Sequence, residues 1–215
     1  MSQKNQLRAA RELMQNVHQH DKTGHDSAHI DRVLQLALTI AEDYPEANLF
    51  VIQMATLLHD TVDDKLKEYA ISLKQLQSFL KEIAVSDDEQ DAIIYVITHI
   101  SFRKRKDVNA LKTIEAKIVQ DADRLDALGA IGLARTFQFS GYFKEAMWTG
   151  HHSYEELMAF SDFSTLPASA IKHCFEKLLQ LKDLMNTEKG KEIAQQRHTF
   201  VESFLKQFFN EWQSQ

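Results

Sequence analysis

Apolar residues recur every three to four positions through most of the chain, which is the spacing of amphipathic α-helices. The clearest stripe runs from about Ala28 to Tyr44 and stops at Pro45, a residue that cannot continue a helix. An earlier helix is expected from about Leu7 to Val17, and a third begins near Asn48 and carries a solid apolar run. The first part of the chain is therefore predicted to be helical.

Capping signatures mark three further helix starts, because a Ser is followed three positions later by Glu or Gln. These signatures begin at Ser72, Ser86 and Ser153. The run after Ser86, AIIYVITHI, has β-branched residues that would also suit a strand, but the capping signature favours a helix. Later helices are predicted over 111–139 (eased or interrupted at Gly129 and Gly132), over 167–185 with Pro167 in the first turn, and over 187–212.

Glycine and proline are too scarce for an architecture of strands and tight turns, since the 215 residues include only 6 Gly and 2 Pro. There are no internal repeats and no long Gly/Ser linkers. We therefore predict an all-α fold in a single domain over 1–215, with its core motifs in 23–129 and a helical extension from about 140 to 215. The least regular segment is 140–166.

Charge and composition narrow the function classes. The formal net charge of −6 argues against a nucleic-acid partner. No run reaches the roughly 18 apolar residues of a membrane span, and the first residues lack the apolar core of a signal peptide. The single Cys174 excludes an intramolecular disulfide framework, so a cytoplasmic protein is expected. The Phe-rich end of the chain is interpreted as a packing stripe or as the face of a homodimer.

One stretch changes from apolar to acidic within a few residues. The run ATLLHDTVDD, residues 55–64, ends in His59, Asp60, Asp63 and Asp64. Helical spacing would place these side chains on adjoining parts of one face. Like charges so close together, and at a helix C-terminus, are unfavourable unless a cation or a proton offsets them. A divalent metal would meet both objections, and a solvated helix end is the alternative for this stretch by itself.

Two other stretches strengthen the metal hypothesis. TGHDSAHIDRV, residues 23–33, contains His25, Asp26 and His29. VQDADRLDALG, residues 119–129, contains Asp121, Asp123 and Asp126 among apolar neighbours. At least one carboxylate of the latter group should face the core, where it needs a partner or a metal. Three such clusters in an apolar setting favour a metal site over three solvated surfaces.

The order of these motifs resembles the H…HD…D signature of the HD-domain metal-dependent phosphohydrolases. In this sequence the signature consists of His29, His59–Asp60 and Asp123. The flanking runs HIDRV, ATLLHD and DADRLDALGAIGLAR are similar to those of the bacterial stand-alone HD hydrolases related to the YedJ and YpgQ proteins, and the likeness covers roughly 20–212. The resemblance implies a helical HD-domain bundle with additional C-terminal helices.

The resemblance also implies a ligand set. The metal ligands would be His29, His59, Asp60 and Asp123. Asp126 is the rival of Asp123, which is preferred because ADRL is similar to the context of the family's last ligand. Mixed imidazole and carboxylate ligands suit several divalent ions, and the resemblance favours Mn²⁺, with Mg²⁺, Ni²⁺, Co²⁺, Fe²⁺ and Zn²⁺ as alternatives.

Further site residues follow from the same resemblance. Asp63 and Asp64 match an acidic pair that follows HD in guanosine tetraphosphate hydrolases, with Asp in place of Glu at the first position, and they are candidates to orient or deprotonate the attacking water. His25 is a candidate contact to substrate phosphate, whereas Asp26 is equally suited to cap a helix. The basic run SFRKRKD is either a solvated loop or a polyphosphate clamp that uses Arg103 and Lys104.

The function implied is hydrolysis of a nucleotide by metal-activated water. The nearest relatives in this resemblance suggest a pyrophosphohydrolase of nucleoside or deoxynucleoside triphosphates. A guanosine tetraphosphate hydrolase, another phosphomonoesterase or phosphodiesterase, and a non-catalytic regulatory HD module that binds a metal or nucleotide are the alternatives. A panel of nucleotides that resolves orthophosphate from pyrophosphate would discriminate among them.

Overall fold

The computed structural model describes residues 1–63, 66, 69–100 and 111–212. The described residues form helices and loops, with an isolated parallel bridge between Ala146 and Ser169, so the predicted all-α class is confirmed. The chain divides into two compact units: Met1–Asp21 with His25–Asp123, and Lys22–Gly24 with Arg124–Gln215. The predicted single domain over 1–215 stays a prediction. Within the described ranges, no helix is both long enough and apolar enough to cross a membrane.

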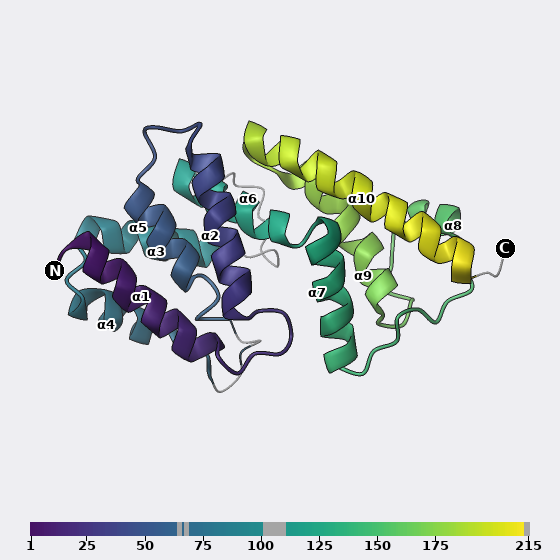
Figure 1. Cartoon of the computed structure of the whole chain (residues 1–215), viewed down its shortest axis with the longest axis horizontal. Helices are drawn as coiled ribbons and strands as arrows, with labels where there is room; N and C mark the ends of the chain where they lie inside the picture. Colours follow the sequence, from purple (N-terminus) through teal and green to yellow (C-terminus); the bar gives the residue numbers. More distant parts are fainter. Residues whose placement is uncertain (64–65, 67–68, 101–110, 213–215) are drawn as a thin grey trace. The chain divides into compact units, whose positions relative to one another are not determined.

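The first unit is built around one buried helix, α3 (Leu49–Leu58), which packs against α1 (Gln3–His18), α2 (Ser27–Ala41) and α5 (Asp87–His99) (Figure 1). The side-chain oxygen of Asn48 starts α3 by accepting hydrogen bonds from the backbone N–H groups of its first turn. Eight of its ten residues are buried, so neighbours hold the helix around most of its circumference. The residues that directly follow Leu58, His59 and Asp60, are therefore held in a fixed position.

Capping chemistry explains where other helices begin. Ser72 forms the predicted capping box at α4 (Leu73–Glu82), and Ser153 forms one at α8 (Tyr154–Met158). Ser86 does precede α5, which confirms a helix in the run AIIYVITHI. The predicted capping box is wrong there, however, because the Ser86 hydroxyl donates to the Glu89 carboxylate at 2.6 Å instead of accepting from the backbone.

The second unit follows α6 (Ile114–Asp126), whose last residues belong to it. It contains α7 (Gly129–Tyr142), α8, α9 (Ala170–Glu176), the 3₁₀-helix η3 (Leu178–Leu184) and α10 (Glu188–Trp212). Helix α10 packs against α7, α8 and η3. Its Phe209 is buried among the aromatic rings of Trp148, Tyr154 and Phe175, whereas Phe200 is exposed.

Two predicted helices are divided in the structure. The interruption expected at Gly129 in the helix over 111–139 is confirmed, because α6 ends at Asp126 and Gly129 begins α7 with φ +73°, a conformation that favours glycine. Gly132 lies inside α7. The helix expected over 167–185 is also divided. Ser169 rather than Pro167 stands at the start of α9, and Lys177, with φ −130°, separates α9 from the 3₁₀ turns of η3. This second division was not predicted, because apolar periodicity does not report the backbone dihedrals of Lys177.

Candidate metal centre

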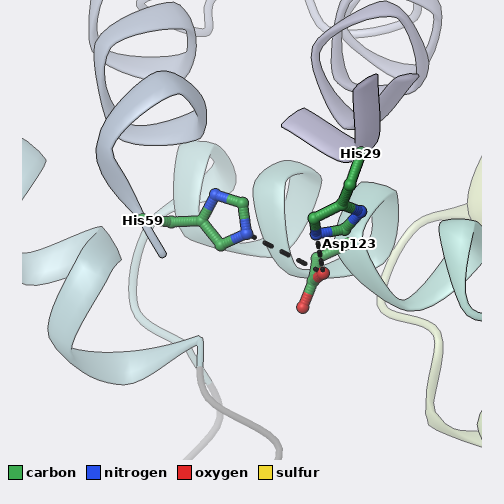
Figure 2. Close-up of side chains that lie close together, drawn as sticks. All are labelled: His29, His59 and Asp123. Atoms are coloured by element: carbon green, nitrogen blue, oxygen red, sulfur yellow. Dashed lines mark ion pairs between the residues drawn. The ribbon is translucent and has the colours of Figure 1, made fainter. Parts of the chain in front are cut away.

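Three helices of the first unit bring two imidazoles and two carboxylates together. His29 lies in the first turn of α2, His59 and Asp60 follow α3 directly, and Asp123 lies in the last turn of α6. One ligand atom each from His29, His59 and Asp123 lie within 4.8 Å of one another. Figure 2 shows both imidazole rings directed toward the carboxylate of Asp123.

The carboxylate of Asp60 also lies close to the Nε2 atoms of both rings. Its Oδ2 lies 3.4 Å from Nε2 of His29, and its Oδ1 lies 3.4 Å from Nε2 of His59. The corresponding distances from Oδ1 of Asp123 are 3.5 Å to His29 and 3.8 Å to His59. Each imidazole Nε2 therefore faces an oxygen from both carboxylates.

His29 is positioned by the cap of its own helix. The side chain of Asp26 accepts a hydrogen bond from the backbone N–H of His29 at 2.9 Å, which fixes the first turn of α2. Such a cap contributes about 1 kcal/mol to helix stability. The structure thus confirms the helix-capping role expected for Asp26. The imidazole of His29 is buried, and the cap fixes the backbone that carries it.

His59 has one ring nitrogen engaged and one without a hydrogen bond. Its Nδ1 donates to the carbonyl oxygen of Thr56 at 2.8 Å, so Nδ1 carries a hydrogen and Nε2 of the neutral ring presents a lone pair. That Nε2 is buried and has no hydrogen-bond partner, although carboxylate oxygens of Asp60 and Asp123 lie 3.4 Å and 3.8 Å away. Metal-ligating imidazoles commonly show this arrangement, with the other nitrogen bound to a carbonyl. The geometry fits a ligand role.

The electrostatics of the cluster show that it favours a positive charge. Burial lowers the pKa of His59, but the carboxylates of Asp60 and Asp123 outweigh burial and raise the pKa to about 9. Burial likewise disfavours the ionised forms of both carboxyls, yet the neighbouring imidazoles, chiefly that of His59, hold the pKa of Asp60 well below its usual range and lower the pKa of Asp123. A proton on His59 thus supplies the cation that two adjacent carboxylates require.

The donor set is chemically suited to a divalent transition metal. Imidazole nitrogens combined with carboxylate oxygens suit Mn²⁺, Fe²⁺, Co²⁺, Ni²⁺ and Zn²⁺, and carboxylates also suit Mg²⁺. The residues present therefore fit the divalent ion that the resemblance implies, and the ion's identity stays a prediction.

The two rival carboxylates of α6 have different partners. Asp123 belongs to the cluster with His29 and His59. Asp126 is buried, and its Oδ2 accepts from Nη1 of Arg135 at 2.9 Å. The same Nη1 also donates to the backbone carbonyl of Asp126, while Nε of Arg135 donates to the carbonyl of Gly24 at 2.7 Å. Asp126 thus has a charged partner from the chain itself.

The remaining predicted site residues differ in what the structure shows of them. His25 is half-buried, and its ring centroid lies 5.9 Å from that of His29. Asp63 is half-buried in the turn after Asp60, and its backbone N–H donates to the Asp60 carbonyl at 3.0 Å. Three predicted residues lie outside the described ranges: Asp64, Arg103 and Lys104.

His18, at the end of α1, was not indicated by the sequence. It is buried, and its Nδ1 donates to the carbonyl oxygen of His25 at 2.5 Å. A single histidine at a helix C-terminus carries no spacing signal, because such residues are common there for reasons of the helix dipole. Only the fold reveals its contact with a candidate site residue.

Comparison with known proteins identifies the family of this chain. Residues 27–128 match the HD domain family. The uncharacterized protein YpgQ of Bacillus subtilis is 38% identical over 209 residues, covering 96% of this chain and 94% of YpgQ. A crystal structure of YpgQ in complex with ADP has a TM-score of 0.77 at 34% identity, covering 98% of this chain and 97% of that one. A Bacillus thuringiensis HD-superfamily hydrolase has a TM-score of 0.73 at 34% identity over both full chains. The chain therefore belongs to the HD domain family and has the fold of the HD-superfamily hydrolases.

Proposed function

We propose that this protein is a divalent-metal-dependent phosphohydrolase that converts nucleoside or deoxynucleoside triphosphates to monophosphates and pyrophosphate. The observation that carries the proposal is the convergence of His29, His59, Asp60 and Asp123, with one buried imidazole nitrogen left without a hydrogen bond. The relative YpgQ has been crystallised in complex with ADP, which supports a nucleotide as the ligand.

These four side chains would hold the ion, for which Mn²⁺ is the favoured candidate. A bound divalent ion would polarise the phosphate and lower the pKa of a water molecule. The chain's own contribution is to keep the ligands in position before the ion arrives. Thr56 fixes the tautomer of His59 through its carbonyl, and Asp26 fixes the turn that carries His29. Both contacts are made by backbone or capping groups of the chain itself.

His25 and the acidic pair complete the proposed reaction. The half-buried ring of His25 lies beside His29, where its nitrogen could donate to a phosphate oxygen. Asp63 and Asp64 are proposed to take the proton from the attacking water. The water oxygen forms a bond to the α-phosphorus, the bond from that phosphorus to the α–β bridging oxygen breaks, and pyrophosphate leaves with the bonding electrons.

The test is a product analysis with Mn²⁺-loaded protein. We would incubate it with ribo- and deoxyribonucleoside triphosphates, ADP and guanosine tetraphosphate, and resolve pyrophosphate from orthophosphate. The expected products are monophosphate and pyrophosphate in equal amounts. His59→Ala should abolish turnover, whereas Asp91→Asn, at an exposed carboxylate on α5, should leave it unchanged.

The other outcomes each identify a different function. Orthophosphate released stepwise would point to a phosphomonoesterase, and turnover of guanosine tetraphosphate alone would point to that hydrolase class. If Mn²⁺ binds and no nucleotide is turned over, the chain is a non-catalytic HD module.

A further inference from the structure

A closed ring of three hydrogen bonds links the end of α1 to the residue that begins the His25–Asp26 motif. The N–H of Asp21 donates to the carbonyl of His18 at 3.0 Å, and the N–H of His25 donates to Oδ2 of Asp21 at 2.7 Å. Nδ1 of His18 then donates to the carbonyl of His25 at 2.5 Å. We call His18, Asp21 and His25 the His18 clamp. All three belong to the first unit.

The chemistry of His18 shows which of its nitrogens acts. A carbonyl oxygen can only accept, so the nitrogen that faces His25 must carry a hydrogen. The ring is 1% exposed, and burial lowers its pKa, which favours the neutral form. Its Nε2 is buried without a hydrogen-bond partner. An apolar side chain would fill this space without a buried unpaired nitrogen, so what the imidazole adds is the bond from Nδ1.

The clamp fixes the backbone of His25 on both sides of its Cα atom. The N–H on one side and the carbonyl on the other are each bonded to a clamp residue, which leaves only the side-chain torsions free. The ring of His25 lies edge-to-face against that of His29, with centroids 5.9 Å apart. The ring of His29 in turn lies 5.8 Å from that of His59. A displacement of the His25 backbone would therefore move its ring relative to both proposed metal ligands.

We propose that His18 is a positioning residue, whose Nδ1–H holds the backbone of His25 so that the His25 imidazole meets a substrate phosphate beside the metal ligands. This inference rests on the proposed function, because it takes His25 as a phosphate contact. His18 itself touches the peptide of His25 and no reacting atom.

Substitution of His18 by Asn or by Gln distinguishes the role of its Nδ1 from that of its Nε2. The amide nitrogen of Asn can take the place of Nδ1, whereas that of Gln extends toward the place of Nε2. His18→Asn should therefore keep the bond to His25, and His18→Gln should lose it. The first measurement is hydrogen exchange of the segment containing the His25 amide in metal-free protein. Loss of the bond from His18 to the His25 carbonyl should speed exchange by about fivefold to tenfold in His18→Gln. His18→Asn, which keeps the bond, should exchange near the wild-type rate.

The second measurement concerns the ligand. With Mn²⁺ at saturation, His18→Gln should weaken ADP binding and lower kcat/KM for the triphosphate by about tenfold, while the affinity for Mn²⁺ stays within twofold of wild type. His18→Asn should restore both quantities to within about threefold. In a His25→Ala background, His18→Gln should have no additional effect, because the two residues act through one path.

The outcomes decide the proposal independently of the hydrolase assignment. Equal behaviour of the Asn and Gln variants would overturn it, as would faster exchange in His18→Gln with unchanged ADP binding and kinetics. If no nucleotide is hydrolysed, the proposed function fails, and exchange together with ADP affinity still decides the role of His18. Should His18→Gln not fold, Asp21→Ala breaks the same ring at another bond and must reproduce the loss of ADP affinity.

Discussion

Helix α6 carries two carboxylates one turn apart whose surroundings are opposite in kind. The side chain of Asp123 is 35% exposed and faces two imidazoles, whereas that of Asp126 is 2% exposed and faces the guanidinium of Arg135. A guanidinium is always charged, so Asp126 needs nothing from solution. An imidazole supplies a charge only when protonated, so Asp123 and its neighbours favour binding of a proton or a metal ion. The charge state of the partner therefore separates a candidate site from a structural ion pair.

The largest expected effect is on metal binding. Asp123→Ala should lower the affinity for Mn²⁺ by at least about a hundredfold and abolish turnover, since even partners one shell beyond the ligands contribute ten- to a hundredfold. Helical circular dichroism should survive, because the side chain is partly exposed. Titration calorimetry with Mn²⁺ and pyrophosphate release measure the two effects.

The matched control is Asp126→Asn, which keeps an oxygen that can accept from Arg135. It should bind Mn²⁺ with wild-type affinity. The comparison would be reversed if this variant lost the metal and Asp123→Ala retained it.

The next largest effect is on stability. Arg135→Ala leaves the buried carboxylate of Asp126 without its charged partner and removes the bond to Gly24, which should cost about 3–5 kcal/mol of unfolding free energy. The chain's 2 Trp residues, Trp148 and Trp212, both belong to the second unit, so tryptophan fluorescence in a urea titration follows that unit alone.

A surface ion pair supplies the control for the burial of the Asp126 pair. Arg11 pairs with Asp31 in the first unit, where both side chains are well exposed, and Arg11→Ala should cost no more than about 1 kcal/mol of unfolding free energy. Circular dichroism measures this loss, because the first unit contains neither tryptophan. A similar loss for the two arginine variants would mean that burial does not set the strength of the Asp126 pair.

Cys174 provides a chemical probe that distinguishes loss of the Asp126–Arg135 pair from loss of the proposed ligand Asp123. It is fully buried in α9 of the second unit, and burial raises the pKa of its thiol from the ordinary value of 9.0 to about 12. A disulfide reagent should therefore label folded protein only through opening of that unit, and Arg135→Ala should accelerate labelling while Asp123→Ala should not. Equal acceleration by both variants would contradict the distinction.

The raised pKa of Cys174 also predicts how the unfolding free energy changes with pH. The folded chain keeps the thiol protonated where the unfolded chain loses the proton, so the contribution is complete below pH 9.0 and is lost as pH rises toward 12. The unfolding free energy should fall by roughly 1 kcal/mol per pH unit over that interval. The wild-type slope minus that of Cys174→Ala isolates this residue from lysines and tyrosines, and identical slopes would exclude the effect.

The smallest effect concerns a third carboxylate, that of Asp26, which accepts a hydrogen bond from a backbone N–H. Asp26→Ala removes the cap that holds the first turn of α2, which should cost about 1 kcal/mol and weaken Mn²⁺ binding by about threefold to tenfold. Ser72→Ala removes the comparable cap of α4 and should cost a similar amount without changing the affinity for Mn²⁺. Thermal unfolding and calorimetry on both variants test whether the cap of α2 serves the site.

Helix positions were largely predictable because the signals are local. Asn48 starts α3 and Ser153 starts α8 through bonds to their own first turns, so residues two or three positions apart decide the outcome. The clusters around His29, His59–Asp60 and Asp123 could be proposed as one site because family resemblance supplied the long-range association that periodicity lacks.

Other features depend on partners that are distant in sequence. Asp123 and Asp126 have equivalent apolar neighbours along the helix, and the difference between them comes from Arg135 on α7. The proposed role of His18 depends on a hydrogen bond to the backbone carbonyl of His25. The sequence does not indicate this bond, because every residue has a backbone carbonyl. The 3₁₀ turns of η3 follow Lys177, whose φ of −130° has no signal in the spacing of apolar residues.

The order in which the proposed ligands occur along the chain has a consequence for biosynthesis. His29 and the His59–Asp60 pair leave the ribosome well before Asp123, the last of the four. A nascent chain that has not reached α6 lacks one of the two carboxylates, and its other ligands are not yet held by a completed first unit. Because metal affinity is coupled to folding, incomplete chains should compete poorly for Mn²⁺. Acquisition of the metal would then mark a first unit whose synthesis and folding are finished.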